Sequence, residues 1–75
     1  MTKDQEKQIL DWYTNVVQYS CLRAAIRFFK QGQEQGASKL LYSEQDKLRI
    51  HPELVELLKE SFPTYRELVE KGIKP

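Results

Sequence analysis

Most of the residues on which active sites and metal sites depend are scarce in this 75-residue sequence. It has a single cysteine, Cys21, so no disulfide can form within the chain, and nothing indicates an oxidising compartment. It also has a single histidine, His51, and no metal-ligand spacing, nucleotide-binding glycine loop or nucleophile elbow. We therefore expect no catalytic residue, no metal, no cofactor and no small-molecule substrate, and hence no enzyme.

Long apolar runs and an excess of one charge are also absent. The most apolar region, residues 16–29, is interrupted by Gln18, Arg23 and Arg27, and is shorter than the roughly 20 apolar residues that cross a bilayer. The first residues, MTKDQEKQ, are polar, with no apolar core of a signal peptide behind them. Lys and Arg number 12 against 11 Asp and Glu, so the whole chain has no strong attraction to nucleic acid, anionic lipid or acidic protein, and any such attraction must come from local clustering. We expect a cytoplasmic protein outside the membrane.

The composition that is present is that of a folded domain. Hydrophobic residues make up 40% of the chain and charged residues 31%, and glycine and proline are few, which argues against disorder. At this length the chain forms one domain, residues 1–75, near the size at which a single core barely outweighs the entropy of ordering it. Burial against a partner would therefore add needed stability.

A long helix is predicted at the N-terminus. Thr2 and Gln5 have the spacing of a capping box, and neither glycine nor proline follows until Gly32. The helix is expected to run from residue 3 to about residue 31, followed by a turn through Gly32 and Gly36.

The length of this predicted helix poses a problem. It would be ~43 Å long, whereas a compact domain of this size has a diameter on the order of 30 Å. Either it bends near the poor helix formers Thr14 and Asn15, or another chain covers the excess.

Two sides of the predicted helix are apolar in its second half. One side carries the ordinary core stripe, with Val17, Cys21 and Ala24 at steps of three and four. The opposite side carries a second apolar stripe: Leu22, Ala25, Ile26 and Phe29. A helix that is apolar on two sides requires two neighbours, and the rest of the chain has enough apolar residues to cover one of them well. We therefore expect the second apolar stripe to bind a partner, most simply a second copy in a homodimer. The alternative is a self-contained core of three or four helices, in which the C-terminal helices cover both apolar sides.

Shorter helices are predicted in the second half of the chain. Pro52 suits the first turn of a helix, and the residues that follow have a helical apolar stripe: Leu54, Val55, Leu57 and Leu58. Pro63 predicts a kink or break near Phe62. The glutamates on these helices are expected to form solvated faces rather than acid-base machinery.

The last helix is predicted over residues 65–71. Thr64 and Glu67 have the spacing of a second capping box. Gly72 should end the helix, with Ile73 folding back against it.

Residues 39–51 leave two alternatives open. Ser43 and Asp46 have the spacing of a cap for a short helix, whereas residues 48–51 alternate between apolar and polar side chains, which is typical of a strand. The segment is therefore a helix or irregular turn, or else a small β-hairpin. The predicted fold is all-α: a long N-terminal helix with two or three short C-terminal helices packed back on it.

The two scarce reactive residues have ordinary structural interpretations. His51 directly precedes Pro52, where it would cap a helix or point to solvent. Cys21 lies on the core stripe, which indicates a small buried hydrophobe rather than a reactive thiol.

A basic flank follows one edge of the predicted N-terminal helix, at steps of seven, four, four and three: Trp12, Tyr19, Arg23, Arg27 and Lys30. These residues could stack on bases and contact phosphates, clamp an acidic protein, or merely border an apolar face. The expected function is a small protein-interaction module, an adaptor, inhibitor or assembly factor, that buries the second apolar stripe while the cations select its partner. The alternative is a nucleic-acid-binding regulator that uses the basic flank.

Overall fold

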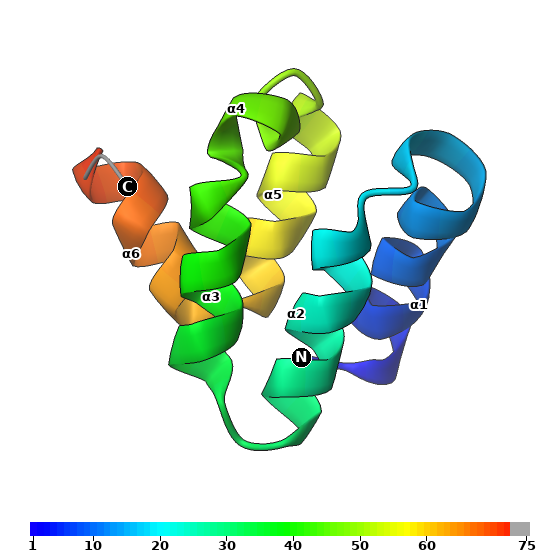
Figure 1. Ribbon diagram of the computed structural model, residues 1–75, viewed down its shortest axis with the longest axis horizontal. Coiled ribbons are helices and arrows are strands. Elements are labelled where there is room, and N and C mark those ends of the chain that lie inside the picture. The colour runs from blue at the N-terminus through cyan, green and yellow to red at the C-terminus, as the bar shows by residue number, and fades with distance from the viewer. Residues whose placement is uncertain (73–75) are drawn as a thin grey trace.

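The computed structural model describes residues 1–72, and in that range it contains only helices and connecting turns. The elements are α1 (Lys3–Trp12), the π-helical turn η1 (Tyr13–Val17), α2 (Ser20–Lys30), α3 (Glu34–Ser43), α4 (Gln45–Leu48), α5 (Pro52–Ser61) and α6 (Pro63–Lys71). Helices α2 and α3 stand side by side as an antiparallel pair, with α1 beside α2 and α6 beside α3 (Figure 1). The predicted all-α class is confirmed.

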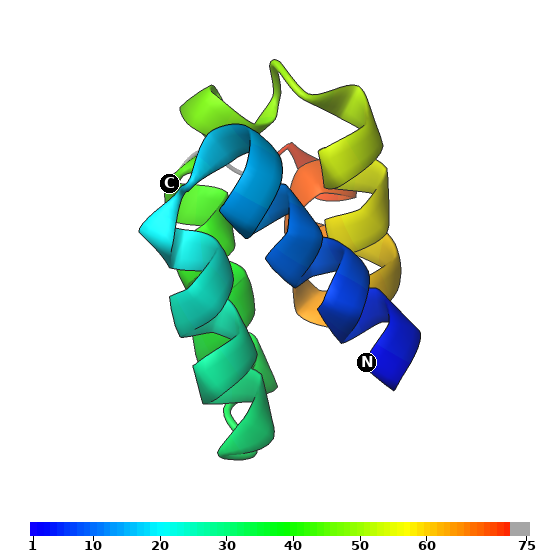
Figure 2. The same ribbon diagram turned by 90° about the vertical axis from the view of Figure 1, so that its right-hand side faces the viewer.

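The predicted unbroken helix from residue 3 to about residue 31 is wrong. Its start is confirmed, because the Thr2 hydroxyl accepts from the Gln5 backbone and the Gln5 side chain accepts from the Thr2 backbone. The helix breaks at Thr14 and Asn15, where a bend is one of the two predicted ways to accommodate its length, and both residues lie in η1. Gln18 follows in a left-handed conformation with φ 52°. The chain therefore turns, and α2 folds back beside α1 (Figure 2).

The connection between α2 and α3 uses one of the two predicted turn glycines. Gly32 has φ 79°, a conformation that strains any residue with a side chain. Gly36 instead lies inside the first turn of α3, where a Cβ atom would stand 3.9 Å from the Gln33 Cβ, an ordinary contact. The predicted turn therefore ends before Gly36.

The β-hairpin considered for residues 39–51 is wrong, because this segment forms the end of α3 and the short helix α4. The alternation of Leu48 and Ile50 is not the pattern of a strand face. Leu48 is fully buried, whereas Ile50 is 66% exposed. The two side chains therefore lie in different environments.

The limits of α5 and the end of α6 are as predicted, whereas α6 begins at Pro63, two residues before the predicted start at residue 65. Phe62 has an extended backbone between the two helices, and its buried ring fills the core. Gly72, with φ 64°, ends α6. The predicted contact of Ile73 lies outside the described residues.

The second predicted capping box is wrong. The N-cap position of α6 is Phe62, with Pro63 in the first turn, and the Thr64 hydroxyl donates to Glu34 of α3 rather than capping its own helix. The Glu34 carboxylate of α3 therefore accepts the Thr64 N–H in the first turn of α6, in place of a cap from α6 itself.

One hydrophobic core joins the helices. Helix α2 lies between α1 and α3, so both of its apolar sides meet helices of the same chain. Tyr65 of α6 is fully buried, and its hydroxyl donates to Gln45 Oε1 of α4 at 2.5 Å. The largest buried apolar side chains are Ile9, Leu22, Leu41, Leu48, Leu54, Leu58, Phe62 and Tyr65.

Candidate binding groove

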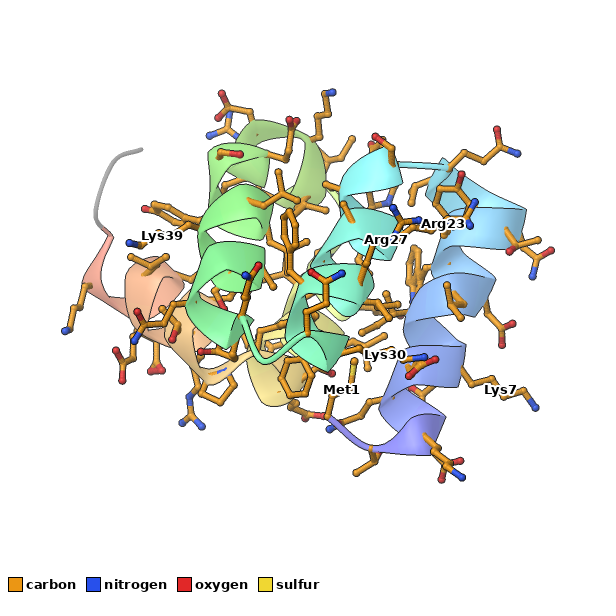
Figure 3. The ribbon with its side chains drawn as sticks, turned by 60° about the horizontal axis from the view of Figure 1, so that its bottom comes forward. Met1, Lys7, Arg23, Arg27, Lys30 and Lys39 are labelled. Carbon is orange, nitrogen blue, oxygen red and sulfur yellow. The ribbon has the colours of Figure 1, made fainter. Side chains whose placement is uncertain are left out.

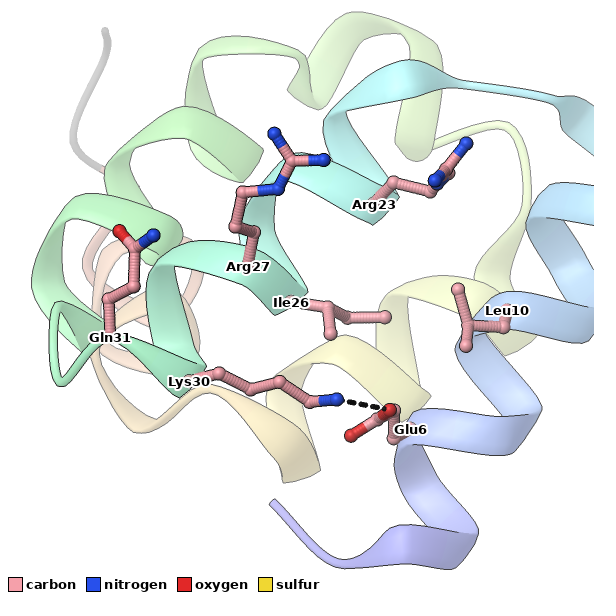
Figure 4. Close-up of a pocket in the computed structure, with 7 residues that line it drawn as sticks. All are labelled: Glu6, Leu10, Arg23, Ile26, Arg27, Lys30 and Gln31. Carbon is pink, nitrogen blue, oxygen red and sulfur yellow. Dashed lines mark ion pairs between the residues drawn. The ribbon is translucent and has the colours of Figure 1, made fainter.

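A groove of about 330 Å³ opens between α1 and α2 (Figure 4). Its floor is apolar and comes from both helices, with Leu10 partly buried and Ile26 almost fully buried. Its rim carries the cations of α2, namely Arg23, Arg27 and Lys30, which we call the cationic stripe. The groove thus combines an apolar floor with a positive edge.

The cationic stripe exists because of the spacing of these residues on α2. Steps of four and three place one cation on each turn of the same helix face, and all three residues are exposed. The sequence contains neither Asp nor Glu between Asp11 and Glu34, so α2 carries no negative charge of its own. The carboxylates beside this face therefore come from α1, where Glu6 pairs with one of the three cations, Lys30.

The three cations are held differently. The Arg23 guanidinium lies 5.5 Å from the centre of the Tyr13 ring, in cation–π geometry. Lys30 Nζ lies 2.9 Å from Glu6 Oε2 across the groove, in a pair that is 60% exposed on the lysine side. Arg27 forms no ion pair with any residue in the range 1–72. Two of the three cations are therefore free to take a carboxylate or phosphate from outside.

The positive character continues along α1. A second hollow of about 590 Å³ adjoins the groove at Glu6, Leu10 and Lys30, and it adds Lys3 and Lys7 together with Asp11. In Figure 3 the side chains of Lys7, Arg23, Arg27 and Lys30 lie on one side of the molecule. This side is thus positive overall, with single carboxylates interspersed.

The structure divides the predicted basic flank. Because the chain breaks at η1, Trp12 and Tyr19 do not continue the row of cations on α2. Their rings instead contact His51, with centroid distances of 5.8 Å from Trp12 and 6.0 Å from Tyr19, both edge-on. The three cations stay together, and the aromatic residues belong to a separate cluster.

His51 joins α1 to the start of α5. It occupies the N-cap position of α5 without a side-chain capping bond, so the predicted cap is not formed. Its Nε2 atom lies 3.5 Å from the Tyr19 hydroxyl. The ring thus packs between two aromatic side chains.

Cys21 is buried, as predicted from its place on the core stripe. Burial, reinforced by the nearby Glu44 carboxylate, raises the pKa of its thiol to about 11. The thiol is therefore protonated and poorly nucleophilic at neutral pH.

Most of the second apolar stripe is buried within the chain itself. Leu22 and Ala25 are fully buried and Ile26 nearly so. Phe29 is partly buried, with its ring 5.6 Å from that of Phe62 at an interplanar angle of 85°. The chain itself therefore covers three of these residues fully or nearly so and Phe29 in part, contrary to the expectation that a partner is needed to bury the stripe, because α2 is flanked by both α1 and α3.

Glu6 and Leu10, the two groove residues supplied by α1, could not be predicted as neighbours of the cationic stripe. On one straight helix Glu6 would lie 24 residues and Leu10 20 residues from Lys30. Only the reversal at η1 brings them opposite α2. The spacing of apolar and charged residues along the sequence does not indicate that α1 lies opposite the cations of α2.

No three His, Cys, Asp or Glu residues gather in metal-binding geometry within residues 1–72. No helix in this range is long and apolar enough to span a membrane.

Comparison with known proteins adds no relative. Neither a family model, nor a curated protein, nor a solved structure matches this chain. The function must therefore be argued from the groove and its charges.

Proposed function

We propose that this protein is a small non-catalytic protein-interaction module, acting in the cytoplasm as an adaptor, inhibitor or assembly factor. It docks an acidic segment of a partner protein, or of a second copy of itself, along the groove between α1 and α2. The observation that carries this proposal is the cationic stripe, which borders an apolar floor and has two members without a carboxylate partner in residues 1–72.

The groove suits a peptide segment that has both carboxylate and apolar side chains. Guanidinium groups bind carboxylates through two parallel hydrogen bonds, which Arg23 and Arg27 could offer. An apolar side chain of the segment would rest on Leu10 and Ile26. Exposed ion pairs contribute only ~0.2–1 kcal/mol each, so we expect the charges to set partner choice and association rate more than affinity.

Nucleic acid is the weaker candidate for the same surface. The basic flank predicted aromatic rings interleaved with cations, but Trp12 and Tyr19 are engaged with His51 and offer no stacking platform beside the cationic stripe. The row of three cations remains the one feature that favours nucleic acid.

Fluorescence anisotropy can test this proposal with three labelled probes: a short Glu/Leu peptide with helical spacing, the same peptide with Gln in place of Glu, and a short DNA duplex. We expect the protein to bind the Glu peptide in preference to both of the others. Binding of the duplex without binding of the Glu peptide would overturn the proposal and favour the nucleic-acid alternative.

A matched pair of variants locates the binding site. R23Q/R27Q removes two charges from the groove, and K47Q/R49Q removes two charges from the region of α4. We expect the first variant to weaken binding of the Glu peptide at least tenfold and the second to leave it within twofold. Equal loss in both variants would indicate a non-specific charge effect.

A further inference from the structure

Helix α5 carries an exposed row of carboxylates that matches the cationic stripe. Glu53, Glu56 and Glu60 follow steps of three and four, so they lie on one face of the helix, and all three are exposed. We call these three residues the acidic stripe. Glu53 and Glu60 form no ion pair among the described residues, so the stripe has charge available for an outside partner.

The two stripes have the same spacing when the helices are antiparallel. Along α2 the cations stand at relative positions 0, 4 and 7, counted from Arg23. Read backwards from Glu60, the carboxylates of α5 also stand at 0, 4 and 7. Both rows span ~10.5 Å, and both helices have nearly the same length.

We infer that the acidic segment docked by the groove is helix α5 of a second copy of this chain, running antiparallel to α2. This inference rests on the cationic stripe of the proposed function and names its partner. The leucines of α5 are buried in the core of their own chain, so this contact uses the charges of the groove and not its apolar floor. In this arrangement Arg23 faces Glu60 of the second copy, Arg27 faces Glu56 and Lys30 faces Glu53. Lys30 and Glu56 each exchange a partner of their own chain, Glu6 and Lys59, for these contacts.

The positions of the two helices determine what kind of assembly forms. Helices α2 and α5 lie on opposite sides of α1 in Figure 2, so one copy can present its acidic stripe without covering its own groove. Each copy then uses α2 toward one neighbour and α5 toward the next. Such a heterologous contact builds short chains rather than a closed symmetric dimer.

Two cations beside the acidic stripe limit the strength of this contact. Lys59 and Arg66 lie next to Glu56 and Glu60, but each is held by a carboxylate of its own molecule: Lys59 by Glu56 at 3.5 Å and Arg66 by Glu70 at 2.8 Å. The surface therefore stays negative overall. We expect an association that is weak, rapid and sensitive to salt.

Sedimentation velocity of the full chain tests the inference through charge reversal. At about 20 mM salt the weight-average sedimentation coefficient should rise with protein concentration, and at about 500 mM salt the rise should disappear, because salt screens exposed charges. R23E/R27E and E56R/E60R should each stay monomeric at low salt, since each variant then carries two stripes of the same sign. An equal mixture of the two variants should associate again. The negative α2 stripe of R23E/R27E can then pair with the positive α5 stripe of E56R/E60R, and the unchanged stripes of the two variants can pair with each other.

The control is K47E/R49E, which reverses two cations in the region of α4 and should associate like the native chain. Circular dichroism melts show whether each variant is folded, and R23Q/R27Q replaces R23E/R27E if the latter unfolds. The inference is overturned if the native chain stays monomeric at low salt, or if association persists after either stripe is reversed. Binding of the Glu peptide is measured separately, so the groove can succeed as a docking site while self-association fails.

Discussion

The Thr64 hydroxyl donates to the Glu34 carboxylate at 2.6 Å, across a separation of 30 residues. The same carboxylate accepts from the Thr64 backbone at 2.9 Å and from the Ser38 hydroxyl at 2.7 Å. The Glu34 side chain of α3 thus accepts hydrogen bonds from donors in the first turn of α6, which has no side-chain cap of its own. This contact fixes α6 against α3, and through α3 it supports the helix that carries the cationic stripe.

Removing this carboxylate should destabilise the fold. We expect Glu34→Ala to lower the free energy of unfolding by about 1–3 kcal/mol, because it leaves the partly buried Thr64 donors unpaired. Glu67→Ala is the control, since Glu67 is exposed and the capping box predicted for it is absent; it should change stability by about 0.5 kcal/mol or less. Urea unfolding followed by circular dichroism measures both. Equal effects of the two substitutions would contradict the role of Glu34.

The same contact should make stability depend on pH. Partial burial alone would raise the pKa of the Glu34 carboxyl, but the hydrogen bonds from Thr64 and Ser38 outweigh it and hold the pKa below its ordinary value of 4.5. A carboxyl whose pKa is lowered by folding stabilises the folded state above its ordinary pKa, and this contribution is lost as pH falls toward the lowered value. We expect Glu34→Gln to lose less stability than the native chain between about pH 5 and pH 3. Parallel loss in both proteins would place the acid sensitivity elsewhere.

The burial of α2 predicts a large effect of a core substitution. Leu22→Ala should lower the free energy of unfolding by about 2–5 kcal/mol, because Leu22 is fully buried and the shorter side chain leaves a cavity. Val16→Ala is the comparison, since Val16 is 59% exposed, and it should cost less than about 1 kcal/mol. Thermal and urea unfolding at low protein concentration measure both. If Leu22→Ala were as mild as Val16→Ala, the side chain would not be buried within the single chain.

The two glycines around the α2–α3 turn should respond in opposite directions. Gly36→Ala should stabilise the protein by about 0.5–1 kcal/mol, because Gly36 lies in a helix with room for a methyl group. Gly32→Ala should destabilise it by about 1 kcal/mol or more, because its φ of 79° disfavours any side chain. Melting temperatures of the two variants, measured side by side, provide the test. A stabilising Gly32→Ala would contradict the left-handed turn.

The thiol of Cys21 should be protected by folding. Its burial and its pKa of about 11 predict slow reaction with a thiol reagent at neutral pH, and a large increase in rate once denaturant unfolds the chain. Leu22→Ala should accelerate the reaction at low denaturant, because it raises the population of open states. Rapid labelling of the native chain at neutral pH would contradict the burial of this residue.

Local signals account for the parts of the fold that were predicted correctly. The capping box at Thr2, the break at Pro63 and the end at Gly72 each depend on a few adjacent residues, and each forms as expected. The cations of the stripe were also found, because helical spacing alone places Arg23, Arg27 and Lys30 on one face. The other wall of the groove, with Glu6 and Leu10, and the link from Glu34 to Thr64 join residues far apart in sequence, and no periodicity indicates them.

The sequence by itself determined that this chain is helical, where α1 begins, where α5 begins and ends, where α6 ends, and which face of α2 is positive. Only the tertiary structure decided which apolar residues remain exposed, because that depends on the turn at η1 and Gln18. A straight rod would leave one apolar side of α2 uncovered, whereas a chain that folds back places α1 against it. Because the helix is interrupted at η1, the second apolar stripe is buried in the core and does not form the predicted partner surface. The same interruption places α1 beside α2, which forms the groove between them.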